Sequence, residues 1–152
     1  MREAPLERAE VVMGPTAIIG GTGLDHMDSL VVARREAVST PFGSPSAPLI
    51  HGTLDGAPVV FLARHGEGHT VPPHKLNFRA NIWALKNVGV GRVIAVAAVG
   101  GIATDAGPRR IVIPHQVIDY TYGRSQTFFE DPGTRSPTST SPTRTARNSA
   151  RH

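Results

Sequence analysis

Short apolar runs alternate with glycine-rich and polar segments through the middle of this chain, and their lengths predict strands. The runs 17–19, 31–38, 49–54 and 59–63 all have strand length. The last of these is apolar throughout, which is the pattern of a strand covered on both faces. Runs at 92–99 and 111–113 predict two further strands, of which the first is expected to be buried.

Residues 76–88 carry the clearest helical pattern. Phe78, Ile82 and Leu85 lie three or four positions apart, and Gly89 follows as a stop signal. We expect Phe78 and Trp83 to be packing residues and Asn77 to cap the first turn. Because strand, helix and strand follow one another, the pattern predicts an α/β fold with a parallel sheet rather than a sandwich.

The two ends of the chain differ from this body, for which we predict one domain over residues 15–131. Residues 1–14 are charged and aperiodic, which predicts a flexible leader, with Met13 as an alternative start of translation. Residues 132–152 hold nine Ser or Thr and three Pro, with two alanines as the sole aliphatic side chains. Such a segment cannot offset roughly 1 to 2 kcal/mol of backbone entropy per residue, so we predict a disordered tail. The repetitive Pro, Thr, Ser and Arg composition of this tail resembles the product of a gene translated in a shifted reading frame.

The formal net charge of +4 belongs wholly to that tail, since the residues before it hold 12 basic and 12 acidic side chains. A basic arm that binds nucleic acid is therefore one alternative function, and a merely solvated tail is the other. The absence of cysteine excludes a disulfide scaffold, a cysteine-ligated zinc and a thiol nucleophile. No apolar run approaches the roughly 20 residues of a membrane span, and Glu3, Glu7 and Glu10 do not fit a signal peptide. We expect a cytoplasmic protein with no membrane partner.

A cluster of glycines ends the first predicted strand. The segment 20–23 reads Gly-Gly-Thr-Gly, which suits an anion cradle because glycine lets backbone N–H groups approach a phosphate and Thr22 adds a hydroxyl. The spacing does not match a dinucleotide fingerprint, since His26 stands where the third glycine belongs. A tight turn without ligand is the alternative.

Arg64 and His65 close the strand at 59–63, and ligands bind at strand ends in parallel sheets. Arginine offers a planar fork of donors that matches phosphate oxygens, and His65 can add a further donor. His65, His69 and His74 do not suggest a metal site, because no carboxylates accompany them and two prolines intervene; a loop that shapes a pocket fits them better. Arg79 can reach phosphate or a neighbouring subunit, with plain solvent exposure as the alternative.

Six segments together resemble the N-terminal half of the methylthioadenosine and methylthioinosine phosphorylases, in the trimeric purine nucleoside phosphorylase superfamily. The resemblance covers roughly residues 16–131. The sequences Ala-Pro-Leu at 47–49 and Pro-His-Gln-Val-Ile-Asp-Tyr-Thr at 114–121 favour the methylthioinosine branch. It implies the N-terminal part of the nucleoside phosphorylase fold, a mixed and largely buried sheet with flanking helices. The segments are 18–24, 40–46, 61–66, 72–81, 99–102 and 118–121.

The resemblance also implies a reaction. Inorganic phosphate attacks C1′ of the nucleoside, the purine leaves, and 5-methylthioribose 1-phosphate forms, with phosphate as co-substrate and no cofactor or metal. Thr22, Arg64 and His65 would bind phosphate. The loop at Ala97 and Ala98 would contribute contacts to the phosphate and the ribose. Family members commonly have Thr or Asn where this chain has Ala97, and one lost hydrogen bond to a charged ligand costs about 1.5 to 3 kcal/mol.

Members of the resembled family continue for about another hundred residues, and that half supplies the residues that read the base. The catalytic residues on the base side, and the choice between a 6-amino and a 6-oxo purine, belong to it. We therefore predict a truncated chain that binds phosphate weakly and lacks phosphorolytic turnover. The alternative is a non-catalytic fragment that associates with full-length subunits, since half a sheet leaves open strand edges.

Overall fold

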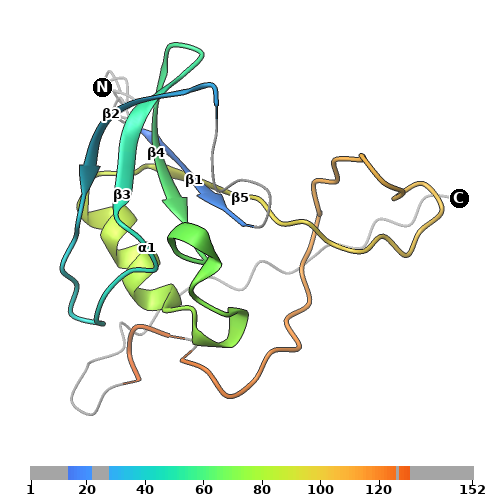
Figure 1. Ribbon diagram of the computed structural model, residues 1–152. Coiled ribbons are helices and arrows are strands. Elements are labelled where there is room, and N and C mark those ends of the chain that lie inside the picture. The colour runs from blue at the N-terminus through green and yellow to red at the C-terminus, as the bar shows by residue number, and fades with distance from the viewer. Residues whose placement is uncertain (1–13, 22–27, 126, 131–152) are drawn as a thin grey trace, which may run out of the picture.

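The computed structural model describes residues 14–21, 28–125 and 127–130, and within them a five-stranded sheet carries one α-helix on one face (Figure 1). The sheet order is β2-β3-β4-β1-β5. The α/β class is confirmed. The strands are β1 (Thr16–Gly20), β2 (Leu30–Glu36), β3 (Leu49–Leu54), β4 (Ala57–Ala63) and β5 (Arg92–Ala95).

The sheet is parallel on one side and antiparallel on the other. β1 pairs in parallel with both β4 and β5, whereas β3 pairs in antiparallel fashion with β2 and β4. The reason is the length of the connections. Asp55 and Gly56 both have positive φ and turn β3 directly into β4, while α1 lies in the crossover from β4 to β5. The predicted parallel sheet therefore holds for β4, β1 and β5.

The α-helix α1 (Phe78–Asn87) follows two 3-10 turns, η1 (Glu67–His69) and η2 (Pro73–Lys75). Asn77 caps it as predicted: its Oδ1 accepts a hydrogen bond from the backbone N–H of Ala80 at 3.1 Å. The Asn77 amide also donates to the carbonyl of Phe42 at 2.6 Å. This side chain therefore fixes both the start of α1 and the loop that crosses it.

The buried face of α1 differs from the predicted one. Phe78 and Ile82 are 38% and 41% exposed, and Trp83 is half-buried. The helix rests on the sheet through small side chains, which allow close approach, and the expected stripe of large residues contributes Leu85 alone. The buried positions of the helix are Ala80, Asn81, Ala84 and Leu85.

The core lies between α1 and the central strands. Val60 and Leu62 of β4 are almost fully buried, as is Phe61, which points to the opposite face of the sheet. Burial fades toward the sheet edges, where β2 and β5 are exposed along most of their length. The prediction of a largely buried sheet therefore holds for the central strands and fails for the edge strands β2 and β5.

Two strand predictions are wrong after position 91. β5 ends at Ala95 instead of Val99, and all four of its residues are exposed rather than buried. Residues 111–113 form no strand, although their apolar β-branched side chains favour one; Ile111 and Ile113 are 94% and 90% exposed. Strand formation needs a pairing neighbour and a surface to bury against, and the described residues provide neither at this place.

No helix in the described part of the chain is long and apolar enough to cross a membrane. The predicted leader, apart from Gly14, and the predicted tail at 132–152 lie outside the described residues.

Candidate functional site at the ends of three parallel strands

The carboxyl ends of β1, β4 and β5 meet at one edge of the sheet. Two backbone hydrogen bonds extend the pairing beyond the strands: Arg64 N–H donates to the Gly20 carbonyl at 3.1 Å, and Val96 N–H donates to the Ile19 carbonyl at 3.0 Å. The predicted segments at Gly20, at Arg64 and at Ala97 therefore belong to neighbouring strand ends, as an anion site in an open α/β sheet requires.

The guanidinium of Arg64 connects all three ends. Its Nη1 donates to the Val96 carbonyl after β5 at 2.7 Å, and its Nε donates to Nε2 of His65 at 3.2 Å. The group also lies against Gly21, where an added Cβ would come within 2.2 Å of Nη2. Arg64 is thus oriented by contacts from β1, β4 and β5 at once.

His65 supports this orientation. Its Nδ1 lies 3.0 Å from the Val71 carbonyl, an acceptor, so Nδ1 carries the proton and Nε2 is left to accept from Arg64. The ring also stacks on His69, with centroids 5.4 Å apart and planes 10° apart. In this geometry His65 holds the guanidinium in place, whereas the sequence suggested a direct donor to the anion.

The remaining donors of Arg64 define what the site can do. A guanidinium has five N–H groups, and the bonds to Val96 and His65 use one on Nη1 and the one on Nε. Among the described residues, no hydrogen-bond partner is found for the second N–H of Nη1 or for the two N–H groups of Nη2, which lies against Gly21. A positioned arginine edge beside a glycine-rich strand end is suited to a phosphate or carboxylate.

The other predicted residues have mixed outcomes. Thr22 lies outside the described residues. Ala97 and Ala98 follow Val96 directly and are exposed at the same strand end. Arg79 lies over the ring of Phe42, 5.0 Å from its centroid, instead of facing solvent. Among the described residues, no group of three His, Asp or Glu side chains is arranged to hold a metal.

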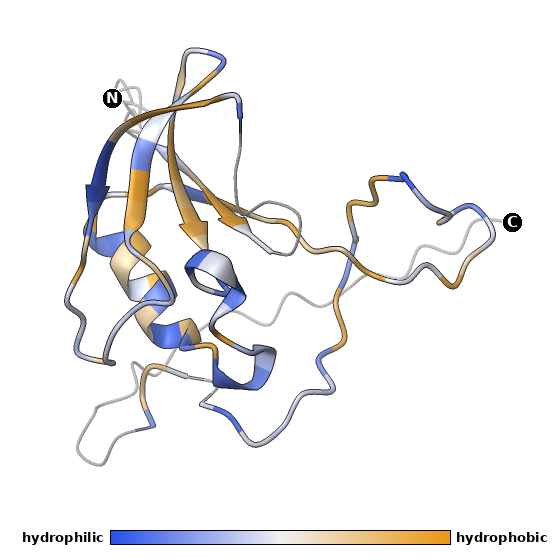
Figure 2. Ribbon diagram, viewed as in Figure 1, coloured by the Kyte–Doolittle hydropathy of each residue, from blue (hydrophilic) through white to orange (hydrophobic). Residues whose placement is uncertain are grey.

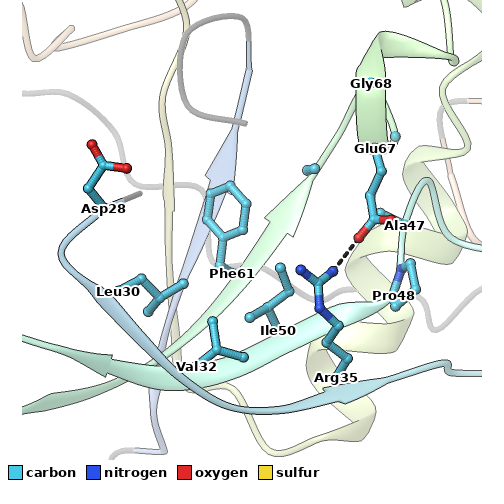
Figure 3. Close-up of a pocket in the computed structure, with 12 residues that line it drawn as sticks. Asp28, Leu30, Val32, Arg35, Ala47, Pro48, Ile50, Phe61, Glu67 and Gly68 are labelled. Atoms are coloured by element: carbon cyan, nitrogen blue, oxygen red, sulfur yellow. Dashed lines mark hydrogen bonds and ion pairs between the residues drawn. The ribbon is translucent and has the colours of Figure 1, made fainter. Parts of the chain in front are cut away.

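A hollow of about 500 Å³ lies beside this edge, on the face of the sheet away from α1 (Figure 3). Phe61 and Ile50 form its apolar floor, and an ion pair between Arg35 and Glu67 crosses its rim. Ala63 and Gly66, the neighbours of Arg64 and His65, line it, but Arg64 and His65 do not. The hollow therefore adjoins the candidate anion site without containing it.

Two features of the site were missed by sequence reasoning. The Val96 carbonyl is a backbone group, so no residue type indicates it. Asn81 is 4% exposed; its Oδ1 accepts from Ser46 N–H at 2.8 Å and its Nδ2 donates to Ser46 Oγ at 3.0 Å. This tie fixes the segment 40–47 against α1, and the polar residue on an otherwise apolar helix face was its signal.

The fold and the strand-end arginine describe an α/β protein with a candidate oxyanion site. The chain matches the family model described as the phosphorylase superfamily over residues 15–152, and it belongs to that family. The match runs past residue 131, where the resemblance described above ends.

Curated relatives are similar over most of this chain. It is 52% identical over 117 residues to a probable S-methyl-5′-thioinosine phosphorylase of Xanthomonas campestris, covering 77% of this chain and 47% of that protein. It is 52% identical over 120 residues to the S-methyl-5′-thioadenosine phosphorylase of Hyperthermus butylicus, covering 79% of this chain and 44% of that protein. The chain spans about half the length of these relatives.

The fold comparison agrees. The methylthioadenosine phosphorylase of Schistosoma mansoni in complex with adenine superposes with a TM-score of 0.74 at 38% identity, covering 80% of this chain and 44% of that one. The predicted N-terminal part of the nucleoside phosphorylase fold is confirmed.

Proposed function

We propose that this chain carries the phosphate-binding half of a methylthio-nucleoside phosphorylase. In the proposed reaction, phosphate attacks C1′ of methylthioinosine or methylthioadenosine and releases the purine with 5-methylthioribose 1-phosphate. The observation that carries the proposal is Arg64, which contacts the ends of β1, β4 and β5 and keeps guanidinium N–H groups that have no partner among the described residues. Thr22 and the backbone at Ala97 and Ala98 complete the proposed phosphate site.

The chemistry of the site supports this reaction. Cleavage of a ribosyl–purine bond develops positive charge on the sugar, so a phosphate dianion held beside C1′ both stabilises that charge and supplies the nucleophile. Arg64 would keep the dianion in place, and His65 would keep Arg64 in place. Positioning of phosphate by Arg64, and of Arg64 by His65, requires no cofactor or metal.

Turnover also needs groups that stabilise the departing purine. The chain spans 47% of the Xanthomonas relative, and the charged side chains that line the apolar hollow next to the anion site are Asp28 and the mutually paired Arg35 and Glu67. We propose that residues 1–152 bind phosphate but do not release a base. The trimeric assembly and cytoplasmic location implied by the resemblance are part of the same proposal.

The test is phosphate binding by isothermal titration calorimetry together with a base-release assay. Arg64→Gln is expected to weaken phosphate binding by about 10- to 150-fold, the equivalent of about 1.5 to 3 kcal/mol for a charged hydrogen bond. Arg34→Gln on the opposite sheet edge is the matched control and should bind like the parent chain. Equal affinities for the parent and Arg64→Gln would refute the phosphate site. Release of hypoxanthine or adenine from the methylthio-nucleosides would refute the inactivity of the chain.

A further inference from the structure

A second hollow, of about 420 Å³, lies at the N-terminal end of α1 and shares no lining residue with the first. Three segments that are distant in the sequence form it: the loop at Phe42, residues 74–79 of η2 and α1, and residues 123–125. Figure 1 shows the last of these segments, drawn in orange, returning to that end of the helix. The residues that orient Arg64 at the strand ends do not line this hollow.

The lining of this second hollow is basic. His74, Lys75, Arg79 and Arg124 are four of its ten residues, and none of the ten is acidic. Figure 2 shows the hydrophilic character of η2, which supplies the first two of these side chains. The chain before position 132 holds 12 basic and 12 acidic residues, so this one-sided lining is local. A concave surface lined by charges of one sign attracts ions of the opposite sign, which here are anions.

Aromatic rings hold two of these cations in place. The guanidinium Cζ of Arg79 lies over the ring of Phe42, 5.0 Å from its centroid. The guanidinium Cζ of Arg124 lies over the ring of Phe78, 5.1 Å from its centroid. The Phe42 ring is itself packed edge-on against Phe128, with centroids 5.2 Å apart. Because both guanidinium groups are positioned before a ligand arrives, less side-chain entropy is lost when they bind one.

We propose that the hollow at the start of α1 binds a small anion with two or more negative charges, of the diphosphate class. Four basic side chains around one hollow favour a ligand that can engage several of them at once. Arginine binds phosphate oxygens through paired N–H groups, and lysine adds a compact charge. The volume lies within the range of about 300 to 1,000 Å³ that is usual for small-molecule sites. This site uses no residue of the proposed phosphate site at Arg64 and is independent of it.

The test is a titration of the 152-residue chain with inorganic pyrophosphate, followed by NMR at the backbone amides of residues 74–79 and 123–125. Saturable shifts at these amides are expected in the parent chain and equally in Arg64→Gln, which lacks the proposed phosphate site. Lys75→Gln and Arg124→Gln should each weaken binding about fivefold, a modest factor because both side chains are exposed. Lys86→Gln, exposed near the other end of α1, is the matched control and should bind like the parent chain.

A parallel titration with ADP separates two sources of the same diphosphate group. Equal affinity for pyrophosphate and ADP would support a site for the phosphate groups alone, whereas tighter binding of ADP would support a site for a nucleotide. The amide spectrum of each variant away from the hollow shows whether that variant folds like the parent chain.

Four results would overturn the proposal. One is the absence of saturable shifts at residues 74–79 and 123–125. Another is equal weakening by Lys75→Gln and Lys86→Gln, which would indicate general attraction to a basic surface. The third is equal weakening by Lys75→Gln and by Arg144→Gln, which would move the binding to the basic tail. The fourth is loss of the shifts in Arg64→Gln, which would place pyrophosphate at the strand ends instead.

Discussion

Arg64 lies directly against Gly21, across the ends of two neighbouring parallel strands. An added Cβ at position 21 would come within 2.2 Å of Nη2 and 2.5 Å of Cζ of the guanidinium. The missing side chain at Gly21 is therefore what admits the arginine to the strand end. The same guanidinium reaches β5 through the Val96 carbonyl, so one side chain fixes the relation of three strand ends.

The first prediction concerns Gly21→Ala. The obstructed atoms are the far end of a flexible side chain, so the variant should fold and move Arg64 rather than unfold the sheet. Loss of the arranged donors is expected to weaken phosphate binding about tenfold, measured by calorimetry. Gly107→Ala is the matched control, because a Cβ there meets nothing within 4 Å. Unchanged phosphate binding by Gly21→Ala would show that the position of Arg64 does not matter.

The second prediction is a gain of affinity in Ala97→Thr. Position 97 is exposed beside the Val96 carbonyl that holds Arg64, and a hydroxyl there restores the polar residue implied by the family resemblance. One added hydrogen bond to phosphate should tighten binding by about tenfold in the same titration. Ala97→Val has nearly the same shape without the hydroxyl and should show no gain. If both variants bind alike, position 97 does not contact the anion.

The third prediction tests the tie between α1 and the segment 40–47. Asn81→Ala removes the acceptor of Ser46 N–H and leaves a part-buried donor without its partner, which should lower the free energy of unfolding by about 1 to 3 kcal/mol in urea. Ser46→Ala removes the hydroxyl bond but keeps that backbone bond, so its effect should be smaller. If Ser46→Ala lowers the free energy of unfolding as much as Asn81→Ala does, the bond from Ser46 N–H to Asn81 is not the main stabilising contact of this tie.

The fourth prediction concerns acid. Hydrogen bonds from the Thr121 hydroxyl and then from the Thr121 N–H lower the pKa of Asp119 below its ordinary value; desolvation opposes them, and the Arg124 charge adds the smallest contribution. Since the pKa is lowered in the folded chain, this turn is favoured above the ordinary carboxyl pKa and lost as pH falls through the lowered value. In an NMR titration, Thr121→Val should move the Asp119 midpoint upward. Thr121→Ser keeps the hydroxyl and should leave the midpoint near that of the parent chain.

The local sequence pattern was sufficient to predict the central strands and the cap of α1. The runs at 17–19, 49–54 and 59–63 form strands, and Asn77 caps α1, because strand length, apolar periodicity and capping are properties of neighbouring residues. Pattern also placed Arg64 and the glycines at strand ends. The motifs were sufficient to predict the family, which the family model that matches residues 15–152 confirms.

By itself, then, the sequence determined the α/β class, the strand ends that carry the candidate chemistry and the family. The tertiary structure alone decided that the alanine side of α1 is buried, that His65 orients Arg64, and that β5 and residues 111–113 are exposed. The physical reason is that burial and hydrogen-bond partners depend on segments distant in the chain. An apolar β-branched run becomes a buried strand only where another segment pairs with it and covers it.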